Sequence, residues 1–104
     1  MAGRQHANPM GTLHGGVLCD IADAAMGIAY ASTLAEGETF ATLELKINFL
    51  KPVWTGKLRA VARIVKRGKT VGLLECDITE EHQSLVARAS STCMTLRGEE
   101  ARGR

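Results

Sequence analysis

A long apolar stretch that contains two carboxylates, residues 17–35, constrains the fold of this chain most strongly. The stretch is rich in alanine and has no proline, so we predict a helix from Val17 to about Leu34. A carboxylate inside a bilayer costs roughly 2.5–3.5 kcal/mol on insertion scales. Asp20 and Asp23 therefore argue against a membrane span and favour a helix inside a globular protein. A helix that is hydrophobic all round has to be covered on most of its sides.

Four strand-like segments follow the predicted helix, at residues 42–50, 58–66, 70–79 and 85–96. In each of the first three, apolar or small residues recur at every second position, which is typical of a half-buried strand. The predicted inward sets are Leu43, Leu45, Ile47 and Phe49, then Leu58, Ala60, Ala62 and Ile64, then Gly72, Leu74, Cys76 and Ile78. Thr42, Glu44, Lys46 and Asn48 are predicted to form the polar face of the first strand.

One apolar helix followed by antiparallel strands predicts an α+β fold, in which a curved sheet wraps around the helix. The length of 104 residues is enough for one domain and not two. Residues 1–7 are a short N-terminal extension, and the charged residues 98–104 are expected to be disordered. Because one sheet covers such a helix only in part, we expect a second subunit to complete the burial in a homo-oligomer.

Composition and charge exclude several classes of protein. The net charge of +2 and the few aromatic residues argue against nucleic-acid binding. Cys19, Cys76 and Cys93 are widely spaced and belong to no metal-binding motif, so we expect no zinc site, no other metal and no disulfide framework. Free cysteines fit a reducing cytosol, and residues 1–6 contain no signal-peptide core. We therefore expect a cytoplasmic protein with no membrane segment.

The segment from Asn8 to Asp23 contains the groups that could carry chemistry. His14 and Gly15 lead into the predicted helix, whose first turn has unpaired N–H groups and a partial positive charge. Glycine allows a carbonyl oxygen to approach such N–H groups closely, as in an oxyanion hole. Asp20 and Asp23 are three residues apart and share one helical face. A desolvated carboxylate next to a polarised carbonyl is a candidate general base or nucleophile.

Each of these residues also has a simpler structural interpretation. Glycines before a helix often only shape the turn, and Asp20 can simply favour the N-terminal end of the helix. His14 alone is more often a hydrogen-bonding residue than a base, and Asn8 precedes a proline as turn residues do. The basic segment 66–69 is most simply a solvated hairpin tip.

Several segments resemble a known family. The stretch NPMGTLHGGVLCDIADAAMGIA resembles the signature of the PaaI-like (phenylacetate-pathway) group of hotdog-fold acyl-CoA thioesterases, within the 4-hydroxybenzoyl-CoA thioesterase superfamily. The stretches TLELKINFLKPVWTGKL, RIVKRGKTVGLLECDIT and SLVARASSTCMTL resemble the strands that follow, so the resemblance covers about residues 8–97. It implies the hotdog fold, a homodimer or homotetramer, and sites at the dimer interface. Because members of this group have more sequence before this motif, we expect the sheet to lack their first strand.

The resemblance also implies roles for five residues. Asp23 matches the catalytic carboxylate, and Gly15 matches the glycine whose N–H polarises the thioester carbonyl. Asn8 matches a residue that holds water or substrate, Thr42 one that supports the attacking water, and His14 one that places the substrate. Asn8 and Gly15 would come from one subunit, and Asp23 and Thr42 from the other.

The implied reaction is hydrolysis of an acyl-CoA thioester with an aryl-acetyl or medium-chain acyl group, without a cofactor. The basic turn of Lys66, Arg67, Gly68 and Lys69 would meet the phosphates of coenzyme A. We expect Met26, Phe49 and Trp54 to line the acyl pocket. Two alternatives remain open: an enoyl-CoA hydratase-type enzyme that uses His14 and Asp23, and a non-catalytic acyl-CoA-binding protein.

Overall fold

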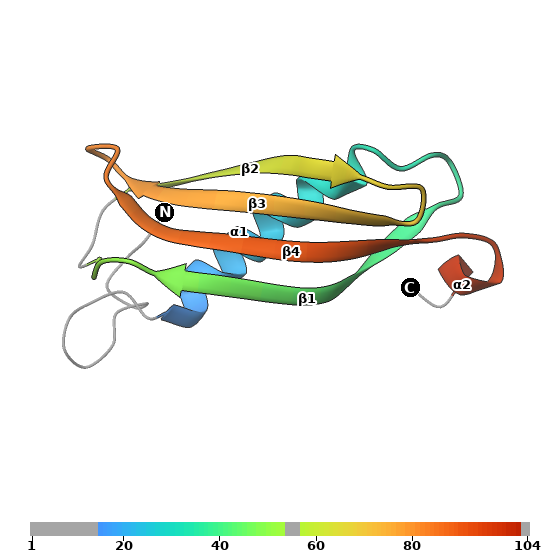
Figure 1. Cartoon of the computed structure of the whole chain (residues 1–104), viewed down its shortest axis with the longest axis horizontal. Coiled ribbons are helices and arrows are strands. Elements are labelled where there is room, and N and C mark those ends of the chain that lie inside the picture. Colours follow the sequence, from blue (N-terminus) through green and yellow to red (C-terminus); the bar gives the residue numbers. More distant parts are fainter. Residues whose placement is uncertain (1–14, 54–56, 103–104) are drawn as a thin grey trace.

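The computed structural model describes residues 15–53 and 57–102. Helix α1 (Gly15–Ala31) lies across one face of a four-stranded antiparallel sheet (Figure 1). The strands are β1 (Thr39–Phe49), β2 (Leu58–Arg67), β3 (Val71–Glu80) and β4 (Leu85–Leu96), and a short helix, α2 (Glu99–Arg102), follows them. The strand order is β1-β4-β3-β2, so β1 and β2 are the edges of the described sheet. This arrangement confirms the predicted α+β fold of a helix wrapped by an antiparallel sheet.

Helix α1 buries one stripe of side chains and leaves the opposite face open. Leu18, Ala22, Met26 and Tyr30 recur at every fourth position and are buried against the sheet. Ile28, on the open face, is 73% exposed. The helix begins at Gly15, before the predicted Val17, and ends at Ala31 rather than Leu34. Hydrogen bonds from Thr33 and Leu34 to carbonyl groups three residues earlier tighten the chain after the helix, as often happens at helix ends.

The inward sets predicted for β2 and β3 are confirmed. Leu58, Ala60, Ala62 and Ile64 pack against the core, and Gly72, Leu74, Cys76 and Ile78 are buried. Gly72 is required by the close approach of the helix, because a Cβ there would lie 2.7 Å from Cε1 of Tyr30. Burial also raises the pKa of the Cys76 thiol, which keeps it protonated in the core.

The face predicted for the start of β1 is wrong, because the strand contains a bulge. The register pairs Thr42 with Cys93 but Glu44 with Thr92, so Leu43 is the extra residue. The bulge turns Thr42 toward the helix side, where its partner Cys93 is buried, and leaves Leu43 54% exposed. Strict alternation along the sequence cannot show this shift, because one extra residue reverses every face that precedes it.

The C-terminal segment also differs from its prediction. Residues 99–102 form α2 instead of a disordered tail, after a turn at Gly98 with a positive φ of 57°. The amide of Ala101 donates to the carbonyl of Gly98. The expectation that the sheet lacks an N-terminal strand concerns residues 1–14, which lie outside the described residues, as do residues 103–104.

Candidate functional site

A hollow of about 430 Å³ lies between the open face of α1 and strand β1. We call it the Asp23 hollow; its lining residues are Asp23, Ala24, Gly27, Ile28, Ala31, Phe40 and Thr42. Asp23 and Thr42 are the two polar members of this set, and the remaining surface is apolar. An apolar concavity of this size with a few convergent polar groups has the general character of a small-molecule site.

The bulge in β1 gives Thr42 its place in the Asp23 hollow. The Oγ1 atom of Thr42 lies 3.9 Å from Sγ of Cys93, within reach of a weak hydrogen bond to sulfur. Cys93 is only 1% exposed, so it is a fixed partner beneath an exposed threonine. Without the bulge, Thr42 would point to the other side of the sheet, as the sequence alternation predicted.

The Gly15 end of α1 faces a second hollow, also of about 430 Å³. We call it the Gly15 hollow; its lining residues are Gly15, Leu18, Phe49, Leu50, Lys51, Pro52 and Val53. A Cβ at position 15 would lie 3.1 Å from Cζ of Phe49, so the phenyl ring uses the space that the glycine leaves. Asp23 follows Gly15 by eight positions in the helix, which is about 12 Å along the axis. In one chain, the two residues therefore lie at different hollows.

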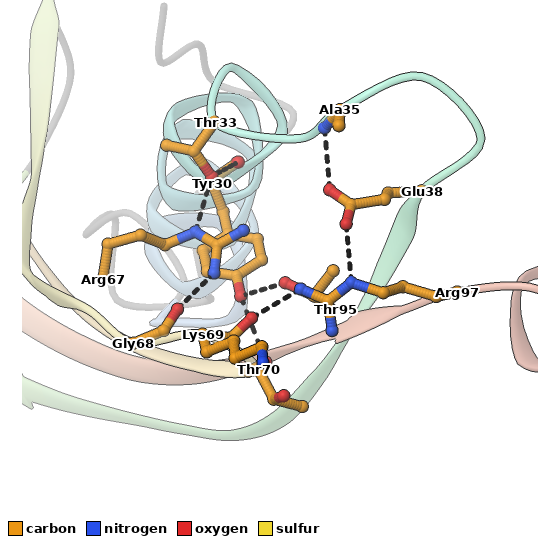
Figure 2. Close-up of polar contacts among 10 residues, drawn as sticks. All are labelled: Tyr30, Thr33, Ala35, Glu38, Arg67, Gly68, Lys69, Thr70, Thr95 and Arg97. Carbon is orange, nitrogen blue, oxygen red and sulfur yellow. Dashed lines mark hydrogen bonds and ion pairs between the residues drawn. The ribbon is translucent and has the colours of Figure 1, made fainter.

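The C-terminal end of α1 is held by a group of residues that we call the Tyr30 cluster: Tyr30, Thr33, Arg67, Thr95 and the backbone carbonyl of Thr70 (Figure 2). The Tyr30 hydroxyl lies 2.6 Å from Oγ1 of buried Thr95, and its ring contacts Phe40 with centroids 5.4 Å apart. The Arg67 guanidinium carbon lies 4.7 Å from the centre of the Tyr30 ring. Its Nε donates to Oγ1 of Thr33 over 2.8 Å, and Nη1 donates to the Gly68 carbonyl.

These contacts separate Arg67 from the other cations of the predicted coenzyme A turn. The Arg67 side chain is half-buried and satisfied within the protein, whereas Lys66 and Lys69 are exposed. Next to this turn, Arg97 donates to Glu38, whose Oε2 lies 2.6 Å from Nε of Arg97, and also to the backbone carbonyl of Lys69 (Figure 2). The amide of Ala35 and the Arg97 guanidinium together lower the pKa of Glu38.

The structure brings together some of the predicted site residues and not others. Asp23 and Thr42 line one hollow, and Gly15 lines the other. Asn8 and His14 lie outside the described residues, as does Trp54, which was expected to line the acyl pocket. Met26 is not a pocket residue, since it is 1% exposed and accepts a hydrogen bond from Ser91 in the core.

Sequence reasoning missed Gly27 and Phe40 as members of the Asp23 hollow. Gly27 faces the hollow from within α1. Its spacing of four residues from Asp23 places it on the same helical face and could have indicated this. No such signal exists for Phe40, which precedes the predicted strand and reaches the hollow only through the sheet geometry.

Within residues 15–53 and 57–102, no helix combines the length and the apolar character needed to cross a membrane. The same residues contain no group of three or more His, Cys, Asp or Glu side chains arranged to hold a metal ion.

Comparison with known families gives a match over most of the chain. A family model described as the thioesterase superfamily matches residues 10–87. Three curated relatives match this chain over 85%, 84% and 84% of its residues. The chain spans only 65%, 61% and 57% of the lengths of those relatives.

Solved structures share the fold over nearly the whole chain. Thioesterase HI1161 from Haemophilus influenzae is 29% identical and superposes with a TM-score of 0.90, covering 97% of this chain and 71% of its own. BH2602 from Bacillus halodurans, solved with CoA, is 33% identical with a TM-score of 0.86 and coverages of 90% and 66%. The PaaI protein from the phenylacetic acid degradation operon of E. coli is 30% identical with a TM-score of 0.81 and coverages of 94% and 70%. These matches confirm the predicted hotdog fold and the resemblance to PaaI-like thioesterases.

Proposed function

Because this chain belongs to the thioesterase superfamily, we propose that it hydrolyses acyl-CoA thioesters to a free acid and coenzyme A. The observation that carries the proposal is the Asp23 hollow, in which a carboxylate and a hydroxyl border an otherwise apolar surface. Such a surface suits an apolar acyl group, and its polar edge suits the reacting carbonyl. BH2602 was solved with CoA, which supports coenzyme A as the other half of the substrate.

In the proposed reaction, Asp23 acts either as a general base or as a nucleophile. Its carboxylate either removes a proton from water as the water attacks the acyl carbon, or attacks that carbon itself to give a mixed anhydride. The C–S bond then breaks and coenzyme A leaves as a thiolate, which needs no strong acid. In the second route, water cleaves the anhydride and restores the carboxylate. The Thr42 hydroxyl, beside Asp23 in the hollow, would hold the attacking water.

We further propose that the complete site needs two copies of the chain. Gly15 and Asp23 are about 12 Å apart along one helix, so they cannot both contact one thioester carbonyl from the same chain. A second copy would bring its Gly15 N–H to the Asp23 hollow of the first, where it would polarise the carbonyl. The exposed side chains of Ile28 on α1, and of Leu43 and Phe49 on edge strand β1, support such a contact.

The proposed function also includes a nucleotide-binding turn and a cytoplasmic location. Lys66 and Lys69 are exposed at the β2–β3 turn and would attract the phosphates of coenzyme A, whereas Arg67 is committed to the Tyr30 cluster. Cys19, Cys76 and Cys93 are free thiols, which supports the reducing conditions of a cytoplasm.

The direct test compares Asp23→Asn with Asp20→Asn in an assay of free coenzyme A released from a panel of acyl-CoAs. Asp20 lies on the same helix and is exposed, but it does not line the Asp23 hollow, so it is the matched control. We expect Asp23→Asn to lower kcat/KM by about 100–10,000-fold, the usual contribution of a general base. Asp20→Asn should retain the wild-type rate. A fully active Asp23→Asn enzyme would rule out the proposed role of this carboxylate.

The two-copy site has its own test. Light scattering at micromolar concentration should give at least twice the mass of one chain. Mixing inactive Asp23→Asn with inactive Gly15→Pro should then restore about a quarter of the wild-type sites, because randomly paired symmetric dimers include hybrids with one intact site. A monomeric active enzyme, or no recovery on mixing subunits that exchange, would contradict this arrangement.

A further inference from the structure

Gly27 occupies a position where folding gives no reason for a glycine. It lies well inside α1, where glycine is less favourable than any residue except proline. Its φ is not positive, unlike those of Gly37 and Gly98. A Cβ added at Gly27 would meet one atom, Cζ of Phe40, at 3.5 Å, an ordinary van der Waals distance. At Gly72, by contrast, the same addition would lie 2.7 Å from Tyr30.

The missing side chain of Gly27 leaves space in the Asp23 hollow. Gly27 follows Asp23 by four residues, so it lies on the same face and about 6 Å farther along the helix. Phe40 lies opposite Gly27, with its Cζ edge toward the glycine. The Phe40 ring rests on Tyr30, which is fixed by Thr95 and Arg67, so this wall cannot yield easily.

We infer that Gly27 and Phe40 determine which acyl groups the Asp23 hollow accepts. This inference rests on the proposed thioesterase function. With the reacting carbonyl next to Asp23, the first carbons of the acyl group lie beside Ala24, and only a longer group reaches the part of the wall that Gly27 and Phe40 form together. This part of the wall is apolar, so it suits hydrocarbon acyl groups that extend about one helical turn beyond the carbonyl. A glycine at this position leaves the hollow wider by one methyl group, at the expense of helix stability.

The test measures kcat/KM for acetyl-CoA, hexanoyl-CoA and phenylacetyl-CoA in wild type and in Gly27→Ala. The alanine methyl group should lower the values for both longer substrates by about tenfold or more, as expected for one unwanted carbon in an apolar pocket. Acetyl-CoA is the internal control, because its acyl group is too short to reach residue 27. Phe40→Leu, which shortens the opposite wall, should shift the preference toward the longer substrates.

The inference is overturned if the ratio of kcat/KM for the longer substrates to kcat/KM for acetyl-CoA in Gly27→Ala stays within about twofold of the wild-type ratio. In that case, turnover itself still upholds the proposed function. A change of solution mass in Gly27→Ala, with the ratio unchanged, also overturns it, because the glycine then makes room for a second copy.

If the wild type hydrolyses none of the substrates, the proposed function fails, and binding decides the inference. Non-hydrolysable thioether analogues of hexanoyl-CoA and phenylacetyl-CoA should then bind Gly27→Ala about tenfold more weakly than wild type. The acetyl analogue should bind wild type and Gly27→Ala equally well. Equal binding of all three analogues by both proteins overturns the inference.

Discussion

The Tyr30 cluster and the open face of α1 belong to the same helix but are built in opposite ways. The cluster joins helix, β2–β3 turn and β4 through a hydroxyl pair, a guanidinium over a ring and hydrogen bonds to backbone (Figure 2). On the open face, Asp23 is exposed, Gly27 lowers helix propensity and Ile28 is 73% exposed. One end of the helix is fixed for stability, while the open face carries groups that folding does not require.

Stability and the proposed chemistry can therefore be changed separately in this protein. Changes in the Tyr30 cluster should act on the free energy of unfolding, because they remove buried contacts. Changes on the open face should act on catalysis or acyl preference and leave folding nearly unchanged. Functional sites commonly contain residues that are poor choices for stability.

The largest expected effect is the loss of Tyr30. Tyr30→Ala removes a fully buried ring and should lower the free energy of unfolding by about 3–5 kcal/mol. Tyr30→Phe keeps the ring but leaves Oγ1 of Thr95 without its 2.6 Å partner, and should cost about 1–3 kcal/mol. Asp23→Asn on the open face is the control and should change stability by no more than about 0.5 kcal/mol. Urea denaturation of the three variants measures this, and equal losses for Asp23→Asn and Tyr30→Ala would contradict the comparison.

The next largest effect concerns the first residue of α1. Gly15→Pro removes the backbone N–H that would polarise the carbonyl, while proline is tolerated in the first turn of a helix. We expect kcat to fall by about 100–1000-fold. Gly15→Ala is the matched control, because it adds a Cβ against Phe49 but keeps the N–H, and it should lose much less activity. Similar losses in both variants would mean that space, and not the donor, explains the glycine.

A smaller effect should separate the three cations of the basic turn. Arg67→Met removes the contacts with Thr33 and Tyr30 and should cost about 1 kcal/mol of stability. Replacing Lys66 and Lys69 by alanine should instead raise KM for acyl-CoA, most strongly at low salt, without changing stability. Thermal unfolding and KM at two ionic strengths distinguish the two outcomes. A KM increase in Arg67→Met that equals that of the lysine variant would break the distinction.

The smallest effect lies on the outer face of the sheet, away from both regions. Arg88 lowers the pKa of Asp77 through a two-point contact of 2.7 and 3.1 Å. Because the folded-state pKa is depressed, the stabilisation is present above the unfolded-state value of about 3.9 and is lost as the pH falls through the folded-state value. Asp77→Asn should therefore reduce the loss of stability between about pH 5 and pH 2, by up to about 1 kcal/mol for a surface pair. Denaturation at a series of pH values checks this, with Asp20→Asn as the control.

Much of the fold could be predicted from periodicity. The helix and the four strands fall within a few residues of their predicted positions, and the inward faces of β2 and β3 match. The failures have physical causes that alternation does not encode. The bulge at Leu43 depends on pairing with β4, and the partner of Arg67 is a helix end that lies far away in the sequence.

The helix, the four strands, the apolar stripe of α1 and the candidate carboxylates can be predicted from the amino-acid sequence alone, because they depend on local propensity and on the spacing of apolar residues. The sequence could not choose between Asp20 and Asp23 without the resemblance to a family. Which side chains share a surface is seen only in the folded chain: Thr42 lies beside Asp23 through a bulge, Phe40 lies opposite Gly27, and Gly15 lies at a separate hollow. Such contacts join residues that are distant in sequence, so they are set by sheet register and helix packing and not by local pattern.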